Sequence, residues 1–353
     1  MAQRLPSAVR EALDRGVAIP ALPLALTAER RLDERRQRAL CRYYLAAGAG
    51  GIAAAVHTTQ FAIREPRHGL FRPVLELVAE ELDRASAARP LVRIGGVCGT
   101  TAQAVAEAEL LRDLGYHAAL LSLAGIGPDD HARLAHCRAV AAVIPLVGFY
   151  LQRAVGGPHL SYGFWREFAA IDAVAAIKIA PFDRYRTIDV VRAVAESGRD
   201  DVALYTGNDD NIVLDLLTPY RFRAGGRVVE RRIVGGLLGQ WAVWTRRAVE
   251  LLDACHAAVE QGGGTLAGLL CLAVAVTDAN AAVFDVANGF AGCIAGVHEV
   301  LRRQGLLEGT WCLDPAETLG PGQAEEIDRV CRAYPELNDD AFVARHRDEW
   351  LEG

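Results

Sequence analysis

Short apolar runs alternate with amphipathic segments along most of the chain. The runs are continuously hydrophobic, which is typical of parallel strands that a sheet buries on both faces. We predict eight such strands, near residues 17–26, 51–56, 91–97, 118–123, 144–150, 173–179, 202–206 and 232–237.

The segments between these strands have helical periodicity. We predict helices over residues 32–47, 69–88, 100–114, 128–142, 162–170, 185–197 and 241–258, with a short helix ending at 217. Three more follow at 265–275, 287–304 and 322–334. Eight strand–helix units fit a closed barrel better than an open sheet. We therefore expect an α/β fold, a (β/α)8 TIM barrel over residues 1–260, with a C-terminal helical extension over 261–353 packed on it.

The composition narrows the class of protein. The 353 residues are 52% hydrophobic and carry a net charge of −6 without blocks of Lys or Arg, so no nucleic-acid partner is expected. The eight Cys form no C-x-x-C pair and are expected to be reduced. The N-terminus lacks a signal-peptide core, and the apolar run at 266–276 is shorter than the roughly 18 residues of a membrane span. We therefore expect a cytoplasmic protein with no membrane partner.

One basic side chain differs from all the others. Lys178 is the only lysine among the 38 Lys and Arg residues, and it lies in the strand predicted at 173–179. An amine can lose its proton and attack a carbonyl, whereas a guanidinium stays protonated. Burial lowers the pKa of a lysine, because desolvation disfavours the charged form. The alternative is a chance survivor in an arginine-rich composition, with its ammonium reaching the strand end.

The active site of a TIM barrel lies at the carboxyl ends of its strands, and this rule selects further candidates. The residues that it selects are His57, Thr58, Thr59, Tyr150, Lys178, Gly207, Asn208, Gly235 and Gly236. A neutral amine on Lys178 forms an imine with a keto group, and the protonated imine withdraws electrons from the neighbouring carbon–carbon bond. The phenol of Tyr150 would relay the protons, and a threonine hydroxyl would extend the relay. Backbone N–H groups of Thr58 and Thr59 would hold a substrate carboxylate.

Each of these side chains also has a structural explanation. Tyr150 fits an aromatic at the barrel rim, and Thr58 and Thr59 fit turn or helix-cap residues. A lone histidine at a strand end, such as His57, is usually structural.

The glycines and the remaining histidines give weaker signals. Gly235 and Gly236 either let the backbone approach a ligand or relieve crowding. The glycine turn at 95–100 lacks both the Rossmann fingerprint and a Walker lysine, so tight turn geometry is favoured over phosphate binding. The nine His are scattered, and neither a metal site nor a cofactor is expected.

The order and spacing of these motifs resemble those of the dihydrodipicolinate synthase and N-acetylneuraminate lyase family of Schiff-base aldolases, over roughly residues 17–255. The family's Gly-Thr-Thr-Gly-Glu turn compares with His57-Thr58-Thr59-Gln60-Phe61. Tyr150 and Lys178 are 28 residues apart, which is the family's spacing between the relay tyrosine and the imine lysine. The family's Ser-Gly-Asp-Asp compares with Thr206-Gly207-Asn208-Asp209.

This resemblance implies roles for several residues. It implies an imine on Lys178, a proton relay through Tyr150 and a supporting role for Thr59. It also implies that the backbone amides of Thr58 and Thr59 help to bind the carboxylate of a 2-keto acid such as pyruvate. A homo-oligomer, either a dimer or a tetramer, is expected by the same likeness.

The sequence departs from the family pattern around the substrate. His57 and Gln60 replace the two glycines that flank the threonine pair. Leu151 follows the tyrosine, Val155 stands where the synthases have an Arg for the second substrate, and Arg153 is near but out of register. We therefore expect a lyase or aldolase acting on a pyruvate-like 2-keto acid, and dihydrodipicolinate synthesis itself is not favoured. The alternative is a catalytically silent barrel that binds a keto acid or a sugar acid.

Overall fold

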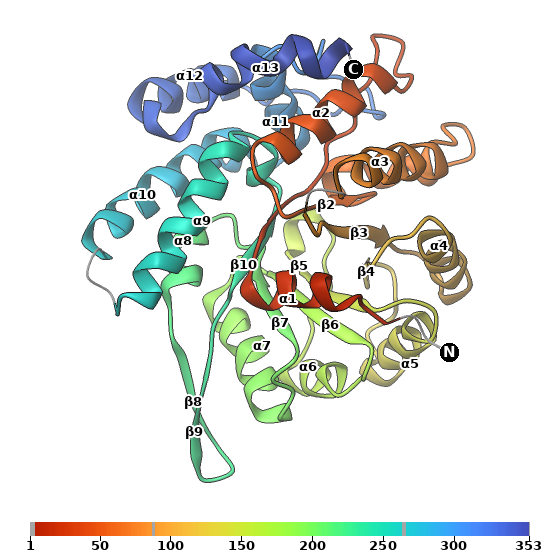
Figure 1. Cartoon of the computed structure of the whole chain (residues 1–353). Helices are drawn as coiled ribbons and strands as arrows, with labels where there is room; N and C mark the ends of the chain where they lie inside the picture. The colour runs from red at the N-terminus through yellow and green to blue at the C-terminus, as the bar shows by residue number, and fades with distance from the viewer. Residues whose placement is uncertain (1–3, 87–88, 263–265, 353) are drawn as a thin grey trace.

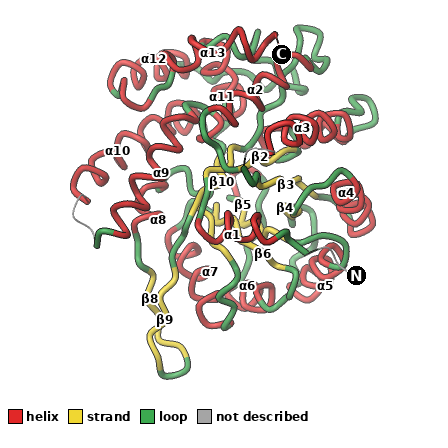
Figure 2. Tube along the Cα trace, in the orientation of Figure 1, coloured by secondary structure: helices red, strands yellow, loops and turns green. Residues whose placement is uncertain are grey.

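Eight parallel strands close into a barrel in this computed structural model, which describes residues 4–86, 89–262 and 266–352 (Figures 1 and 2). The barrel strands are β1 (Ala18–Pro20), β2 (Gly51–Ala54), β3 (Val92–Val97), β4 (Ala118–Leu121), β5 (Leu146–Leu151), β6 (Val174–Ala180), β7 (Ala203–Thr206) and β10 (Gly235–Leu238). They pair in the order β1, β10, β7, β6, β5, β4, β3, β2. Ala21 pairs with Ala53, and Leu22 N–H donates to the Ala53 carbonyl (2.8 Å), which joins β1 to β2. The predicted (β/α)8 barrel is confirmed.

Helices cover the outside of this barrel. They are α2 (Glu34–Ala46), α3 (Phe71–Ser86), α4 (Thr101–Asp113), α5 (Asp130–Ala141), α6 (Tyr162–Ala169), α7 (Arg184–Ser197), α8 (Ile212–Leu217) and α9 (Thr245–Glu260). The side chains of Asp33, Thr100 and Asp129 accept N–H groups from the first turns of α2, α4 and α5, which sets where these helices begin. The end predicted for one helix at Ala88 lies outside the described residues.

Four further helices follow the barrel along one side of the molecule (Figure 1). They are α10 (Leu266–Val283), α11 (Cys293–Arg303), α12 (Gln323–Ala333) and α13 (Asp340–Glu352). The predicted helix start at Thr265 lies outside the described residues, and α13 is absent from the prediction. Helix α13 packs on α2, and α10 packs on α8 and α12. The phenol of Tyr43 in α2 donates to the Asp339 carboxylate (2.8 Å), which ties the extension to the barrel.

Helix α10 is longer than the apolar run predicted at 266–276. This corrects the premise that no apolar segment there is long enough to span a membrane. Its 18 residues have a mean hydropathy of 1.8, so among the described residues it is one helix that meets the length and composition of a membrane span. The helix continues through residues 277–280, which are more polar. Asp278 pairs with Arg329 (2.8 Å), and Asn280 donates to the side chain of Gln240 (3.0 Å). These contacts and its buried face make α10 part of the packed fold.

Two other elements are missing from the predicted pattern. Helix α1 (Ser7–Arg15) packs its buried Val9, Ala12 and Leu13 against the side chains inside the barrel, so it covers one end of it. A hairpin of β8 (Tyr220–Ala224) and β9 (Arg227–Arg231) extends away from the barrel between α8 and β10 (Figure 1). Gly225 and Gly226, with φ of 56° and 79°, form its turn, and a Gly-Gly pair between alternating residues is a hairpin signal.

The strands separate two apolar layers, because successive side chains point to opposite faces of a strand. One cluster fills the inside of the barrel and contains Phe149, Ala176, Ala180 and Tyr205. The other lies between the barrel and its helices, and in β5 and β6 it includes Tyr150, Ile177 and Ile179. This alternation decides which candidate residues reach the barrel interior.

Candidate active site

Lys178 lies near the carboxyl end of β6 and points into the barrel. It pairs with Phe149 of β5 on one side and with Tyr205 of β7 on the other. Its side chain runs beside the Phe149 ring, with Nζ 4.6 Å from the ring centroid. Only 8% of the residue is exposed. The amine is therefore held inside an apolar wall rather than extended to solvent.

Gly207 makes room for this lysine. A Cβ at position 207 would lie 2.6 Å from Cε of Lys178 and 2.7 Å from Cβ of Ala180. No side chain fits there without moving the lysine, since real Cβ contacts are longer. The predicted site residue Gly207 therefore lies against the Lys178 side chain, and its lack of a side chain leaves room for the lysine.

A small cavity of about 50 Å³ surrounds the lysine side chain. Its volume holds a few water molecules or a compact ligand. The lining residues are Ala21, Val56, His57, Thr58, Phe149, Leu151, Gln152, Val155, Lys178, Ala180, Phe182, Gly207, Asp209, Gly239, Phe284 and Cys293. Most of these side chains are apolar, and no arginine is among the described residues that line the cavity.

Burial shifts the proton equilibria in this cavity. It lowers the pKa of Lys178 from 10.5 to about 8, and the nearby Asp209 carboxylate offsets part of that fall. The pKa of His57 is lowered to about 4, by burial first and by the Lys178 charge second. Near neutral pH the imidazole is therefore uncharged, and a usable fraction of the amine is unprotonated.

Asp209 stands at a predicted strand end and in the quoted Thr-Gly-Asn-Asp motif, but the sequence prediction gave it no role in the site. It is 5% exposed and lines the lysine cavity. Its Oδ1 accepts the backbone N–H of Gln240 (2.9 Å). Burial raises the pKa of Asp209 to about 7, while the Gln240 hydrogen bond and the Lys178 charge act in the opposite direction. The signal available in the sequence was an acidic residue just after the strand that follows the lysine strand.

The placement of Tyr150 corrects the predicted relay. Its phenol lies on the outer face of β5, where it donates to the Leu160 carbonyl (3.1 Å) and its ring packs on Trp165 of α6 (5.4 Å between centroids). Lys178 points to the inner face. The two side chains are therefore on opposite sides of the barrel wall, and Tyr150 lies outside the lysine cavity.

A register shift explains why the spacing of 28 residues misled the prediction. The pairing of β5 with β6 is irregular between Leu146 and Val147, where Val174 and Ala176 are the partners and Ala175 is passed over. Beyond the irregularity Phe149, not Tyr150, stands opposite Lys178. A shift of one residue exchanges the two faces of a strand, and it leaves no mark in the spacing.

Comparison with known proteins gives a fold but no close relative. No protein-family model matches the chain, and no curated protein matches its sequence. Dihydrodipicolinate synthase from Oceanobacillus iheyensis is similar in structure, with a TM-score of 0.72 and 19% identity, covering 93% of this chain and 99% of that one. N-acetylneuraminate lyase from Fusobacterium nucleatum has a TM-score of 0.69 and 14% identity, covering 91% and 99%.

The fold is that of the dihydrodipicolinate synthases and N-acetylneuraminate lyases. The predicted resemblance to this family is confirmed for the fold, and the low identities fit a divergent sequence. A putative dihydrodipicolinate synthetase from Pseudomonas aeruginosa, with a TM-score of 0.71 and 17% identity, covers 91% of this chain and 99% of its own.

Residues 57–60 form the turn that compares with the family's threonine motif. Hydrogen bonds to other parts of the protein engage both threonine hydroxyls of this turn. Thr59 donates its hydroxyl to the Leu22 carbonyl (2.6 Å), and Thr58 donates to the Ala21 carbonyl (2.9 Å). The Thr59 N–H donates to the Val56 carbonyl (3.0 Å). Thr58 lines the cavity, whereas Thr59 does not. The Thr59 hydroxyl also accepts the Val56 N–H (3.2 Å), which fits a cap, whereas the Thr58 hydroxyl ties the turn to the segment after β1. Neither the Thr59 N–H nor its hydroxyl points to a substrate.

Gln60 replaces a family glycine and anchors the extension. Its φ is 67°, a conformation that favours glycine and costs other residues about 1 kcal/mol. Its Oε1 accepts the backbone N–H of Leu313 (2.6 Å), which offsets that cost. The loop before α12 is thereby fastened to the threonine turn.

The other predicted binding residues lie away from Lys178. Asn208 donates to the carboxylate of Asp215 (2.9 Å) and to Thr187 (3.0 Å) outside the cavity. Arg153 lines two neighbouring cavities of about 510 and 160 Å³ that share Gln152 with the lysine cavity. It therefore stands beyond the immediate surroundings of the amine.

The two glycines in β10, Gly235 and Gly236, relieve crowding, which is one of the two explanations that the sequence left open. A Cβ on Gly235 would lie 2.6 Å from the Tyr205 ring, and one on Gly236 would lie 2.5 Å from the Trp241 ring. Neither glycine lines the lysine cavity. Among the residues that the structure describes, no group of three or more His, Cys, Asp or Glu side chains is placed to hold a metal ion.

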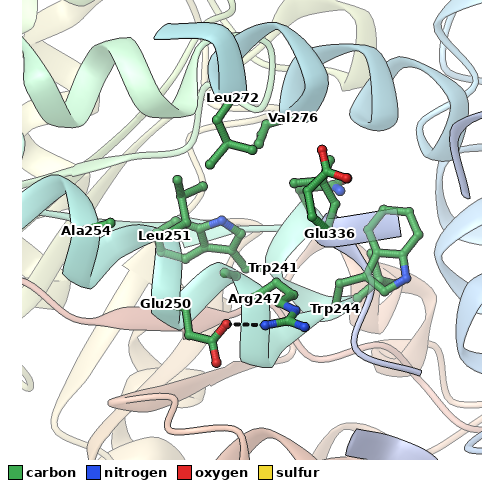
Figure 3. Close-up of a pocket in the computed structure, with 13 residues that line it drawn as sticks. Trp241, Trp244, Arg247, Glu250, Leu251, Ala254, Leu272, Val276 and Glu336 are labelled. Atoms are coloured by element: carbon green, nitrogen blue, oxygen red, sulfur yellow. Dashed lines mark hydrogen bonds and ion pairs between the residues drawn. The ribbon is translucent and has the colours of Figure 1, made fainter. Parts of the chain in front are cut away.

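A separate cavity of about 240 Å³ lies outside the barrel, between α9, α10 and Glu336 (Figure 3). Trp241, Trp244 and Leu251 form much of its wall, and an ion pair of Arg247 with Glu250 (2.7 Å) stands at its edge. None of the predicted site residues lines it. The lysine cavity is therefore the candidate active site.

Proposed function

We propose that this chain is a lyase or aldolase that forms an imine between Lys178 and a small carbonyl substrate. The observation that carries the proposal is the one lysine of the chain, buried near the carboxyl end of a barrel strand and facing a small cavity. Burial in an apolar wall favours the neutral amine, which is the form that attacks a carbonyl carbon. The shared fold with known lyases supports the same chemistry.

A 2-keto acid is the proposed substrate class, with pyruvate as its simplest member. An N-acetylneuraminate lyase and a dihydrodipicolinate synthase of this fold are known in complex with pyruvate. The threonine hydroxyls donate to the carbonyls of Ala21 and Leu22, just after β1, so the cavity differs from the family motif where a carboxylate would bind. A neutral ketone such as acetone is therefore the comparison that tests the need for a carboxylate.

Reduction with borohydride tests the proposal. The protein is incubated with pyruvate, 2-oxobutyrate or acetone, reduced, digested and examined by mass spectrometry. We expect a stable adduct on Lys178, because reduction converts an imine to a secondary amine. The Lys178→Met variant is the control, since it leaves the N-terminal amine as the one other amine in the chain. A wild-type protein that carries no adduct with any of these compounds contradicts the proposal.

The outward position of Tyr150 favours a second candidate, a barrel that binds a carbonyl compound without turning it over. Such a protein would be stabilised by the ligand to heat even when Lys178 is replaced by Met. Exchange of the pyruvate methyl protons with deuterium separates the two, because exchange requires an enamine and binding alone does not produce one.

A further inference from the structure

Imine chemistry needs a group that both donates and accepts protons at the reacting atoms. Tyr150 does not reach them. The titratable side chains that face the lysine cavity from other elements are His57, Asp209 and Cys293. Asp210 lies outside the cavity, and its charge also acts on Asp209.

Two of these three groups are poorly matched to the task. His57, with a pKa of about 4, remains neutral near pH 7 and is a weak base. Burial, and next the Asp209 charge, raise the pKa of the Cys293 thiol well above its ordinary value, so it stays protonated. Asp209, with a pKa of about 7, exchanges protons readily at neutral pH.

The position of Asp209 is also defined. The Gln240 N–H holds Oδ1 at 2.9 Å, and the carboxylate also interacts with the backbone N–H of Asp209 itself. The cavity that holds the Lys178 amine also reaches Asp209. One oxygen is therefore fixed while the other is available to a ligand bound to the lysine.

We propose that Asp209 is the general acid and base of the Lys178 imine reaction, in the place of a relay tyrosine. The inference rests on the proposed function. It assigns the proton transfers to a carboxyl group from the loop after β7, the strand that pairs with β6, and this group lines the same cavity as the amine.

Each step balances with one proton on Asp209. Nζ of neutral Lys178 bonds to the carbonyl carbon, the π electrons move to oxygen, and that oxygen takes the proton of the Asp209 carboxyl. The carboxylate then removes a proton from the new ammonium and returns it to the hydroxyl, which leaves as water. The products are a protonated imine and the Asp209 carboxylate. That carboxylate next removes a proton from the carbon beside the imine, and the enamine forms.

Deuterium exchange into pyruvate, followed by proton NMR, measures these transfers without any second substrate. In Asp209→Asn we expect exchange to fall about 100-fold, because general acid–base catalysis contributes about 10²–10⁴-fold. In Asp209→Glu we expect a fall of about tenfold, since a carboxyl remains but is displaced. In Asp210→Asn, the matched control at the next position, exchange stays within about threefold of wild type.

Borohydride labelling separates the proton relay from the amine itself. Asp209→Asn is expected to keep the adduct on Lys178 at about pH 10, where the amine is neutral without help. The midpoint of labelling against pH is expected to move to lower pH, because the Asp209 charge that favours the ammonium is gone. This shift reports the Asp209 charge near the amine. The loss of deuterium exchange with labelling retained reports the proton transfers themselves.

The outcomes distinguish the role of Asp209 from imine formation on Lys178. Wild-type labelling with unchanged exchange in Asp209→Asn overturns the role of Asp209 and leaves the imine intact. Absence of wild-type labelling overturns the proposed function and this inference with it. If Asp209→Asn fails to fold, the Asp209→Glu variant decides, and wild-type exchange in that variant counts against the role.

Discussion

Two buried carboxylates, Asp209 and Asp215, lie on the same loop and helix after β7, yet their surroundings differ sharply. Asp215 is fully buried and accepts hydrogen bonds from Arg184, Thr206, Asn208, Asn211 and Tyr220. Asp209 accepts the backbone N–H of Gln240 and lines the lysine cavity. The oxygens of Asp215 are therefore fully hydrogen-bonded, whereas those of Asp209 can accept further hydrogen bonds.

This difference shows how one segment holds a structural and a chemical charge side by side. A carboxylate whose oxygens all accept hydrogen bonds from protein donors has no lone pair left for a substrate. A buried carboxyl with few donors has a raised pKa and remains available for proton transfer. Burial alone does not separate the two roles, whereas the hydrogen-bond partners do.

The largest expected effect comes from replacing Asp215 with Asn. Its Oδ1 and Oδ2 each accept at least two donors, so an amide nitrogen on either side would face donors, and the free energy of unfolding should fall by about 3–5 kcal/mol. Urea unfolding measures the change. Asp209→Asn is the matched control, with an expected change of about 1 kcal/mol or less, because its amide oxygen still accepts the Gln240 N–H. Equal losses in the two variants would abolish the distinction.

The second effect is the contribution of Asp209 and Lys178 to the pH dependence of the free energy of unfolding. Between pH 3.8 and about 7 the folded protein keeps a proton on Asp209 that the unfolded chain releases, so stability falls as pH rises through this window. Between about 8 and 10.5 the folded protein lacks a proton that the unfolded chain keeps on Lys178, so stability rises with pH. Each slope is at most about 1.4 kcal/mol per pH unit.

Unfolding curves at several pH values for wild type, Asp209→Asn and Lys178→Met measure these slopes. Asp210 and Asp339 also have raised pKa values, so the acidic slope should become smaller in the first variant rather than vanish. The alkaline slope should become smaller in the second variant. Slopes equal to those of the wild type in both variants would place the titrations elsewhere in the protein.

The smallest expected effect is that of Tyr150→Phe. The variant loses the hydrogen bond to the Leu160 carbonyl, so stability falls by about 0.5–1.5 kcal/mol. Deuterium exchange into pyruvate should stay within about threefold of wild type, because the phenol is on the other side of the barrel wall. A fall of 100-fold in exchange without loss of stability would return the relay to Tyr150.

The sequence predicted the parts of the molecule that depend on local patterns. Strand order, the alternation with helices and the position of Lys178 at the end of β6 follow from apolar runs and turn residues. Gly207, which was predicted as a binding residue, lies against the Lys178 side chain, because β6 and β7 are paired and end at the same edge of the barrel.

The parts that were missed depend on contacts between distant segments. The face of Tyr150 is decided by an irregularity in the pairing of β5 with β6, which no single-strand pattern reveals. Asn208 and Asp209 are adjacent and both polar, and only the packed loop shows that Asn208 bonds to Asp215 whereas Asp209 lines the lysine cavity. The hairpin of β8 and β9 did carry a local signal, the Gly225-Gly226 turn, and that signal was overlooked.

The bond from Gln60 to Leu313 bears on the order in which the ribosome makes the protein. The threonine turn is synthesised early, but its partner at position 313 and the cavity walls from Phe284 and Cys293 are synthesised much later. A nascent chain can complete its barrel strands well before these residues emerge. The reactive amine therefore acquires its finished enclosure only when translation is almost over, and a prematurely terminated chain would carry the lysine without its chamber.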